Sequence, residues 1–313
     1  MRARLPALLT LAAVFGAGPG LGQPAPSCPA SVALVRSTLA EQGLDAAIEV
    51  YKTRVLADCP GPEQAGVARA LALRHLPAIA DAQAAGVPPA ALLELLRRGL
   101  ALDRTAWQLR EVEGDLIQAA ATPATPADFA AAFTAYQAAL LGMSNLRPGQ
   151  TPPRSDEVDR VGRKMEQAGL LSERPIPDMP GPAGSATETA RSFTVTRIAQ
   201  PIYFRENTAS FTDLGRQAAA EVLAMLRSRG FPQVRVIGHT DIRGSVAAND
   251  RLSLARARAV VRFLEQNGYP PNRARAEGRG SRDPYQPVPI TGVTFTQAQR
   301  WQMDRRVEVV IMP

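Results

Sequence analysis

Cysteine and histidine, the side chains that most often bind metals or attack substrates, are scarce in this chain of 313 residues. It has two of each: Cys28, Cys59, His75 and His239. The cysteines lack the CxxC spacing and the histidines lie far apart, which argues against a zinc site and against a Ser-His-Asp triad. We therefore expect no metal, no cofactor and no enzymatic activity. The histidines are expected to be structural.

Long apolar runs are also missing. Residues 5–17 form the longest one, which is too short to span a membrane. Arg2 and Arg4 precede it and small residues follow up to Gly22, the order of a secretory signal peptide. The sequence thus predicts a signal peptide over 1–22 and a periplasmic protein, with association to the outer membrane left open. A lipid anchor is disfavoured because the residues before Cys28 fit a lipoprotein signal poorly.

Lysine is nearly absent, since 34 of the 36 basic residues are arginine. This bias looks compositional, so the arginine count alone is weak support for any ligand. The distribution of charge is more informative: residues 1–190 carry a net charge of −2 and residues 191–313 carry +9. A basic domain suits nucleic acid, an anionic membrane surface or an anionic polymer such as a cell wall. An exported protein rarely meets nucleic acid, so we expect a wall or membrane surface.

The two cysteines that are present predict a disulfide. In an oxidising compartment a pair such as Cys28 and Cys59 is usually bonded. Residues 30–42 and 44–56 read as two helices joined at Gly43. An antiparallel hairpin of this kind brings the two cysteines to the same end.

The pattern from Ser31 to Leu171 is helical throughout, without a residue signature that recurs at a fixed period. Helices are predicted at 31–42, 44–57, 62–80, 89–101, 104–121, 127–142 and 155–170. Residues 172–190 are rich in proline, glycine and small polar residues, as in an interdomain linker. We therefore predict an α-helical periplasmic domain over 23–171, a linker over 172–190 and a second domain over 191–313.

In the second domain, strands alternate with helices, which predicts an α/β sandwich and an α+β chain overall. Strands are expected at 202–204, 233–237, 273–277 and 307–311. Helices are expected from a capping box at Ser210 and Asp213 to Leu226, and from Asp250 to Gln266.

The second of these helices carries a charge in an unexpected place. Arg256 falls among Leu252, Val260 and Phe263 instead of on the charged face. A guanidinium at the edge of an apolar face requires an anionic partner. Asp241 follows a strand directly, where α/β sheets tend to place ligand sites.

Two interpretations of this arrangement stay open. Asp241 and Arg256 could form a structural ion pair. Alternatively they flank a zwitterion, with Asp241 receiving an ammonium and Arg256 a carboxylate. Asn249 is expected to precede the helix, and there it can cap the helix or face the same crevice. Arg305 and Arg306, just before the last strand, could reach the same site.

The stretch GHTDIRGSVAANDRLSLARARAVVRFL, with IYF upstream, GRGSRDP in the middle and DRRVEVV at the end, resembles the OmpA-like C-terminal domain family over about residues 200–312. The resemblance implies a βαβαβ-type sandwich with a mixed sheet that binds peptidoglycan non-covalently, through the diaminopimelate of the stem peptide. Within the family the aspartate of the TD loop and the arginine of LSxxRA are the key contacts. These correspond to Thr240-Asp241 and Arg256, and the family's asparagine corresponds to Asn249.

The sequence departs from the family pattern in three places. Asp304 stands where the last motif has asparagine, Ile242 and Arg243 occupy loop positions that are commonly smaller or polar, and the segment 288–301 is longer than usual. Arg243 could add a contact to a carboxylate. None of the departures replaces Asp241, Arg256 or Asn249.

The resemblance leads to two hypotheses of function. In the first, the protein binds peptidoglycan and tethers a partner or the outer membrane to the wall. In the second, the helical domain carries the function by binding an envelope protein, and wall binding is ancillary.

Overall fold

The computed structural model describes residues 27–147, 150–172, 197–200 and 202–312. They divide into two compact units, one ending at Val67 and one beginning at Ala68. The predicted signal peptide 1–22 lies outside the described residues, as does the predicted linker apart from Ser172. The second unit contains the later helices of the predicted helical domain together with the sheet. The predicted domain boundaries therefore stay a prediction.

The first unit is a disulfide-bonded helical hairpin. Helix α1 (Cys28–Glu41) turns at Gly43, whose φ of 89° favours glycine, into a continuous helical run made of α2 (Leu44–Val50), the π-helical turn η1 (Tyr51–Val55) and α3 (Leu56–Asp58). The Cys28–Cys59 disulfide joins the ends of the hairpin, with the Cα atoms 4.6 Å apart. This confirms the predicted pairing. Ser31 also hydrogen-bonds Asp58 at the same end.

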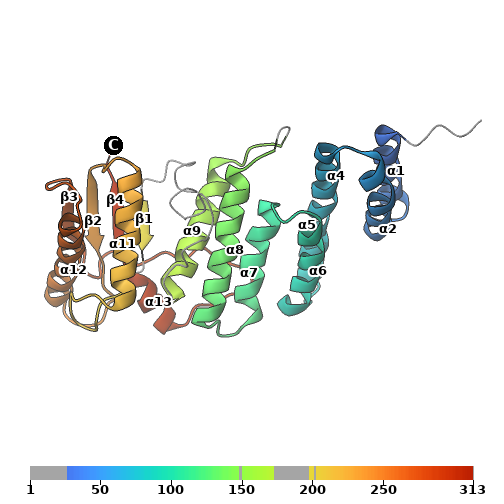
Figure 1. The fold of residues 1–313 in the computed structure, drawn as a ribbon. Coiled ribbons are helices and arrows are strands. Elements are labelled where there is room, and N and C mark those ends of the chain that lie inside the picture. Colours follow the sequence, from blue (N-terminus) through green and yellow to red (C-terminus); the bar gives the residue numbers. More distant parts are fainter. Residues whose placement is uncertain (1–26, 148–149, 173–196, 201, 313) are drawn as a thin grey trace, which may run out of the picture. The chain divides into compact units, whose positions relative to one another are not determined.

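The remaining helices match the predicted ones with one correction. They are α4 (Gly61–Leu73), α5 (His75–Ala84), α6 (Pro89–Leu102), α7 (Trp107–Ala120), α8 (Pro126–Ser144) and α9 (Ser155–Leu171) (Figure 1). The single helix predicted over 62–80 is wrong, because the chain breaks at Arg74. Pro77 has no N–H to donate to the carbonyl of Leu73, which weakens a continuous helix at this point.

A buried ionic cluster joins α7 to α9. The Lys164 ammonium donates to Glu111 at 2.9 Å and to Asp115 at 2.7 Å, and Arg160 also donates to Glu111. Asp115 in turn accepts from the Tyr136 hydroxyl of α8 at 2.7 Å. Because each charge in the cluster has an opposite partner, burial is tolerated and the three helices are held in one arrangement.

The C-terminal strands form a mixed sheet in the order β1-β4-β2-β3, as the fold class predicted. The strands are β1 (Arg197–Gln200), β2 (Val234–Gly238), β3 (Ala274–Gly278) and β4 (Val307–Ile311), and only β2 and β3 are parallel. Helices α11 (Asp213–Ser228) and α12 (Val246–Gln266) share one apolar core with β2 and β4, so both cover the same face (Figure 1). That core includes Val222, Leu226, Val236, Val260, Leu264 and Val309.

Two local predictions here are wrong. Residues 202–204 form no strand, because Phe204 makes only an isolated bridge to Phe211 and the first strand lies at 197–200. The cap of α11 is Thr212 instead of Ser210, since the Thr212 hydroxyl accepts from the amide of Gly215. Both errors come from a tight turn between Phe204 and Phe211 that the residue pattern does not reveal.

A pair of glycines allows α12 to lie close to the sheet. Gly238 and Gly278 are partners in the β2–β3 register. A Cβ on Gly238 would lie 2.1 Å from the carbonyl oxygen of Ser253, and one on Gly278 would lie 2.6 Å from the amide of Leu254. Since these are backbone atoms, the helix could not lie this close to the sheet with any other residue pair.

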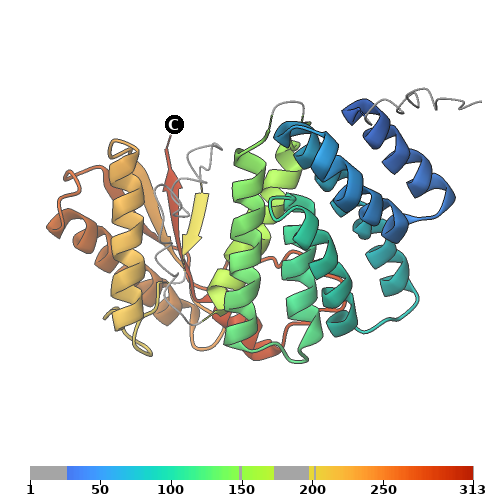
Figure 2. The same cartoon turned by 45° about the vertical axis from the view of Figure 1, so that its right-hand side comes forward.

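The long segment before β4 packs on the helical part of the second unit. It contains α13 (Gln297–Asp304), which the sequence did not predict and which adjoins α9 in both orientations (Figures 1 and 2). Phe295 and Met303 share a core with Phe129, Leu170 and Leu171. Gln167 forms two hydrogen bonds with the backbone of Val288, and Gln302 donates to the carbonyl of Leu170. This segment therefore joins the sheet to the helices.

Among the described residues no helix combines the length and the apolar character needed to cross a membrane.

Candidate functional site

The loop between β2 and α12 carries the candidate site. Its backbone is anchored by the amides of His239 and Thr240, which donate to the carbonyls of Arg306 and Gly280 at 2.9 Å each. The loop ends at Ser245, the cap of α12, whose hydroxyl accepts from the amide of Ala248. Asp241 is therefore placed at the carboxyl end of β2, as predicted.

Asn249 holds the loop instead of capping the helix. Helix α12 begins at Val246, so the predicted start at Asp250 is wrong and Asn249 lies in the first turn. Its side-chain amide donates to the carbonyls of Asp241 at 3.2 Å and Arg243 at 3.1 Å. Gly244, which directly follows Arg243, has a φ of 91°, a backbone conformation that is strained for a residue with a side chain. Asn249 thus fixes the backbone that presents Asp241.

The Asp241 carboxylate is bound by two arginines. Oδ2 accepts from Arg243 and from Arg305 at 2.8 Å each, and Oδ1 accepts from the amide of Arg243 at 3.0 Å. Burial alone would raise the pKa of Asp241, but the hydrogen bonds from Arg243 and Arg305 outweigh it and lower the pKa below the usual value. The carboxylate is therefore charged well into the acidic range.

Arg256 is buried without a carboxylate of its own. Its Nε donates to the carbonyl of Thr208, in the loop before α11, at 3.0 Å, and the guanidinium lies 5.2 Å from the centroid of the Phe204 ring. No described residue forms an ion pair with it. Burial, and then repulsion by Arg305, lower the pKa of Arg256 to about 10. Its terminal nitrogens accordingly remain available to an anion.

The site thus contains three guanidinium groups and one aspartate. The structural ion pair between Asp241 and Arg256 that the sequence left open is not formed, because Arg243 and Arg305 bind Asp241 instead. A ligand with an anionic group can pair with Arg256. A cationic group on the same ligand can approach Asp241 by sharing its oxygens with the exposed Arg243 or Arg305.

The other predicted site residues are placed as follows. Arg305 contacts Asp241, but Arg306 does not: its guanidinium is buried and donates to Glu308 at 2.8 Å, so its predicted contribution is corrected to a structural one. The Thr240 hydroxyl is buried without a hydrogen-bond partner among the described residues. His239 is buried with Nε2 3.5 Å from Glu308 beneath the loop.

Helix α13 adds a contact to the site through Trp301 and ends at Asp304. The Trp301 ring lies 4.7 Å from the Arg243 guanidinium, and Asp304 accepts from the amide of Tyr285 at 2.8 Å. Trp301 was not among the predicted site residues, although a capping box at Thr296 and Gln299 marks the start of its helix. Ile242, which follows Asp241 in the chain, and Val246, the first residue of α12, are exposed apolar residues.

Comparison with known proteins identifies this part of the chain. The model of the OmpA family matches residues 203–288, which include the loop, Asn249 and Arg256. The C-terminal part of the chain is an OmpA-like domain. The helical part before it lies outside this match.

Two relatives and one solved structure illustrate the similarity. Outer membrane protein A of Shimwellia blattae is 33% identical over 119 residues, which cover 35% of this chain and 47% of the relative. The peptidoglycan-associated lipoprotein of Agrobacterium fabrum is 26% identical over 174 residues, covering 54% of this chain and 94% of the relative. The chain thus spans about half the length of the first of these relatives. A crystal structure of the peptidoglycan-associated lipoprotein from Burkholderia pseudomallei has a TM-score of 0.31 and 22% identity, covering 44% of this chain and 100% of that one.

Proposed function

We propose that this protein binds peptidoglycan non-covalently in the cell envelope and tethers a partner or the outer membrane to the wall. The OmpA-like domain supplies the binding site, and one of its relatives is named as peptidoglycan-associated. The observation that supports the proposal most directly is Arg256, a buried guanidinium that makes no ion pair with any described residue and whose pKa is influenced by Asp241 and Arg305.

The proposed ligand is the diaminopimelate of the stem peptide. Its carboxylate would pair with the terminal nitrogens of Arg256, which relieves the cost of burying an unpaired cation. Its ammonium would bind Asp241, which stays ionised because its pKa is lowered. Asn249 positions the loop, and Arg243 and Arg305 hold Asp241 while the site is empty.

Binding of purified sacculi tests the site. Asp241→Ala and Arg256→Ala should each weaken co-sedimentation strongly, because loss of one member of a desolvated charge pair costs about 2–5 kcal/mol. Arg258→Ala is the matched control: it removes an exposed arginine from the same helix and should bind like the wild type. If both site variants bind sacculi as well as the control does, the proposed site is wrong. Free diaminopimelate should compete with wild-type binding.

The proposed role is binding without catalysis. The helical part would hold the tethered partner, as the first of the two hypotheses from the sequence predicted. A pull-down with the full chain carrying Arg256→Ala separates the two roles, since a partner held by the helices should still be recovered.

A further inference from the structure

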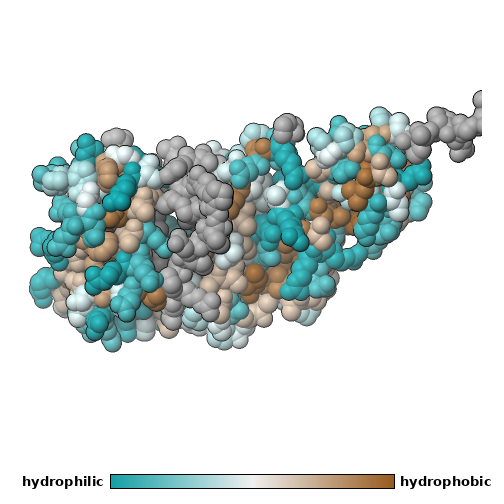
Figure 3. Space-filling view, viewed as in Figure 1, coloured by the Kyte–Doolittle hydropathy of each residue, from teal (hydrophilic) through white to brown (hydrophobic). Residues whose placement is uncertain are grey.

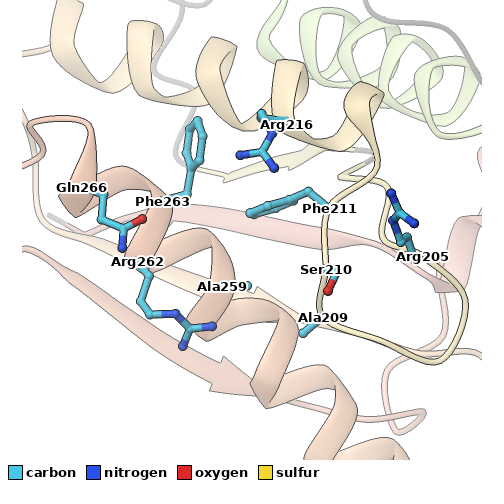
Figure 4. Close-up of a pocket in the computed structure, with 9 residues that line it drawn as sticks. All are labelled: Arg205, Ala209, Ser210, Phe211, Arg216, Ala259, Arg262, Phe263 and Gln266. Atoms are coloured by element: carbon cyan, nitrogen blue, oxygen red, sulfur yellow. The ribbon is translucent and has the colours of Figure 1, made fainter.

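A second candidate site lies between α11 and α12, on the side of the OmpA-like domain that carries both helices. It is an open groove of about 570 Å³ lined by Arg205, Ala209, Ser210, Phe211, Arg216, Ala259, Arg262, Phe263 and Gln266 (Figure 4). The lining includes three arginines and no acidic residue. Figure 3 shows apolar residues enclosed by hydrophilic ones over this part of the molecule.

None of the three arginines has a partner within the described chain. These three side chains form no ion pair and no hydrogen bond with a described residue. By contrast, most arginines near the Asp241 loop form ion pairs. Arg262 is exposed on α12 and borders the groove.

The positions of the charges limit what the groove can bind. The three guanidinium groups come from the loop before α11, from α11 and from α12, and they lie apart around the rings of Phe211 and Phe263 (Figure 4). The two rings meet edge to face at a centroid distance of 5.8 Å. A single small anion cannot reach all three cations. A complementary ligand carries several separated anions with a bulky apolar group between them.

We infer that this groove binds an acidic peptide segment of a partner protein, with carboxylates on the arginines and an apolar side chain against Phe211 and Phe263. A protein segment provides carboxylates and large apolar side chains at the required spacing. The inference concerns a surface separate from Asp241, so it does not rest on the proposed wall binding.

A row of aromatic rings connects the groove to the candidate site at Arg256. Phe211 stacks on Phe204 at 5.0 Å, and Phe204 lies under Arg256. Arg256 also donates to the carbonyl of Thr208, which directly precedes the groove residues Ala209 and Ser210. A peptide in the groove would therefore lie beside a wall fragment held by Arg256.

The test measures binding of a short fluorescent peptide, with two glutamate pairs on either side of Leu-Phe, to the full chain by anisotropy. Arg216→Gln and Arg262→Gln should each weaken binding about threefold and the double variant about tenfold, as expected for exposed ion pairs. Arg258→Gln, an exposed arginine of α12 outside the groove, is the matched control and should bind normally. A peptide with glutamine in place of glutamate should not bind.

Several results would overturn the inference. One is that the double variant binds the peptide as tightly as the wild type does. Another is that Arg258→Gln weakens binding as much as the groove variants do. A third is that the glutamine peptide binds as tightly as the glutamate peptide. If the peptide does not bind, the inference is wrong, and vesicles with an anionic phospholipid and purified sacculi show what the groove holds instead. Loss of either interaction in the double variant would assign the groove to lipid or to the wall. If sacculus binding is lost only in the Asp241 and Arg256 variants, that result bears on the proposed function and not on the groove.

Discussion

At the residue scale, Arg256 explains how the site can be ready for a ligand at the expense of stability. Most of its side chain is buried, its one hydrogen bond to a described residue is to a backbone carbonyl, and burial lowers its pKa to about 10. A buried cation without a counter-ion destabilises the free protein. Binding of an anion should therefore stabilise the folded state by more than surface contacts would.

Arg256→Met separates these two effects. The variant keeps an apolar stem over Phe204 but removes the charge, so we expect the free protein to gain about 1 kcal/mol in the free energy of unfolding and to lose sacculus binding. Denaturant unfolding and co-sedimentation measure the two quantities. A marked loss of stability in this variant would contradict the view of Arg256 as an unpaired cation.

Asp304→Asn tests the departure from the family motif. Burial raises the pKa of Asp304, with a further contribution from Asp241, so its charged form is disfavoured in the folded state. The cost is present at neutral pH and disappears as the pH falls below the ordinary aspartate value of about 3.9. We expect the variant to keep an acceptor for the Tyr285 amide and to add up to about 1 kcal/mol of stability at pH 7, but nothing at pH 3. Unfolding curves at both pH values measure this, and an equal gain at both would contradict it.

The residue pattern predicted that Asp241, Asn249 and Arg256 lie at one crevice, because the end of a strand and the start of the next helix are adjacent in an α/β sheet. The structure shows one direct contact among the three, from the Asn249 side chain to the Asp241 carbonyl. The residue pattern could not predict that Arg243 and Arg305 bind Asp241. The contact from Arg305 depends on where α13 ends before β4, a long-range feature without a local signal.

At the scale of elements, the segment before β4 couples the helices to the site. Phe295 is buried, and its ring stacks on that of Phe129 at a centroid distance of 6.4 Å. The chain continues from Phe295 into α13, which carries Trp301, and then to Arg305. The sequence showed only that this segment is long. Its helix was missed because α13 has eight residues, few of them apolar, and is buried against α9 mainly by Met303.

Phe295→Ala should loosen this coupling. The change removes a buried ring and costs about 3 kcal/mol, mostly in the docking of α13. We expect faster hydrogen exchange in α13 and weaker sacculus binding, because Arg305 and Trp301 lose their support. Gln286→Ala is the control, since this exposed side chain bonds only to the neighbouring Pro284 carbonyl among the described residues. Unchanged exchange in α13 would show that the segment does not depend on this contact.

Helix boundaries illustrate the same limit on prediction. Apolar periodicity located most helices to within a few residues, since each buries one face. It missed the break at Arg74 and the start of α12 at Val246, because a proline three residues away and a serine cap are weak signals beside a strong helical pattern.

At the scale of the whole molecule, the disulfide belongs to the first unit alone. It closes a loop with a sequence separation of 31 residues, which corresponds to about 3–4 kcal/mol from the restricted unfolded chain. The double variant Cys28→Ser, Cys59→Ser should therefore lose hydrogen-exchange protection in α1 and α2 and keep it in α11 and α12. Its sacculus binding should equal that of the wild type. Reduced protection of α12 would show that the two units are not independent in stability.

The register of β1 against β4 determines how a tether built from this domain would respond to tension. Arg197 pairs with Val310 and Gln200 pairs with Val307, so the chain enters β1 at the end of the sheet opposite Arg305 and Asp241. With the wall held at Asp241 and Arg256 and the chain pulled ahead of Arg197, the force runs along the strands. The paired positions of β1 and β4 are then loaded in shear and must give way together, instead of opening one after another from an end. Mechanical lifetime, which depends on the rate of unfolding, is thus set by strand direction as well as by stability.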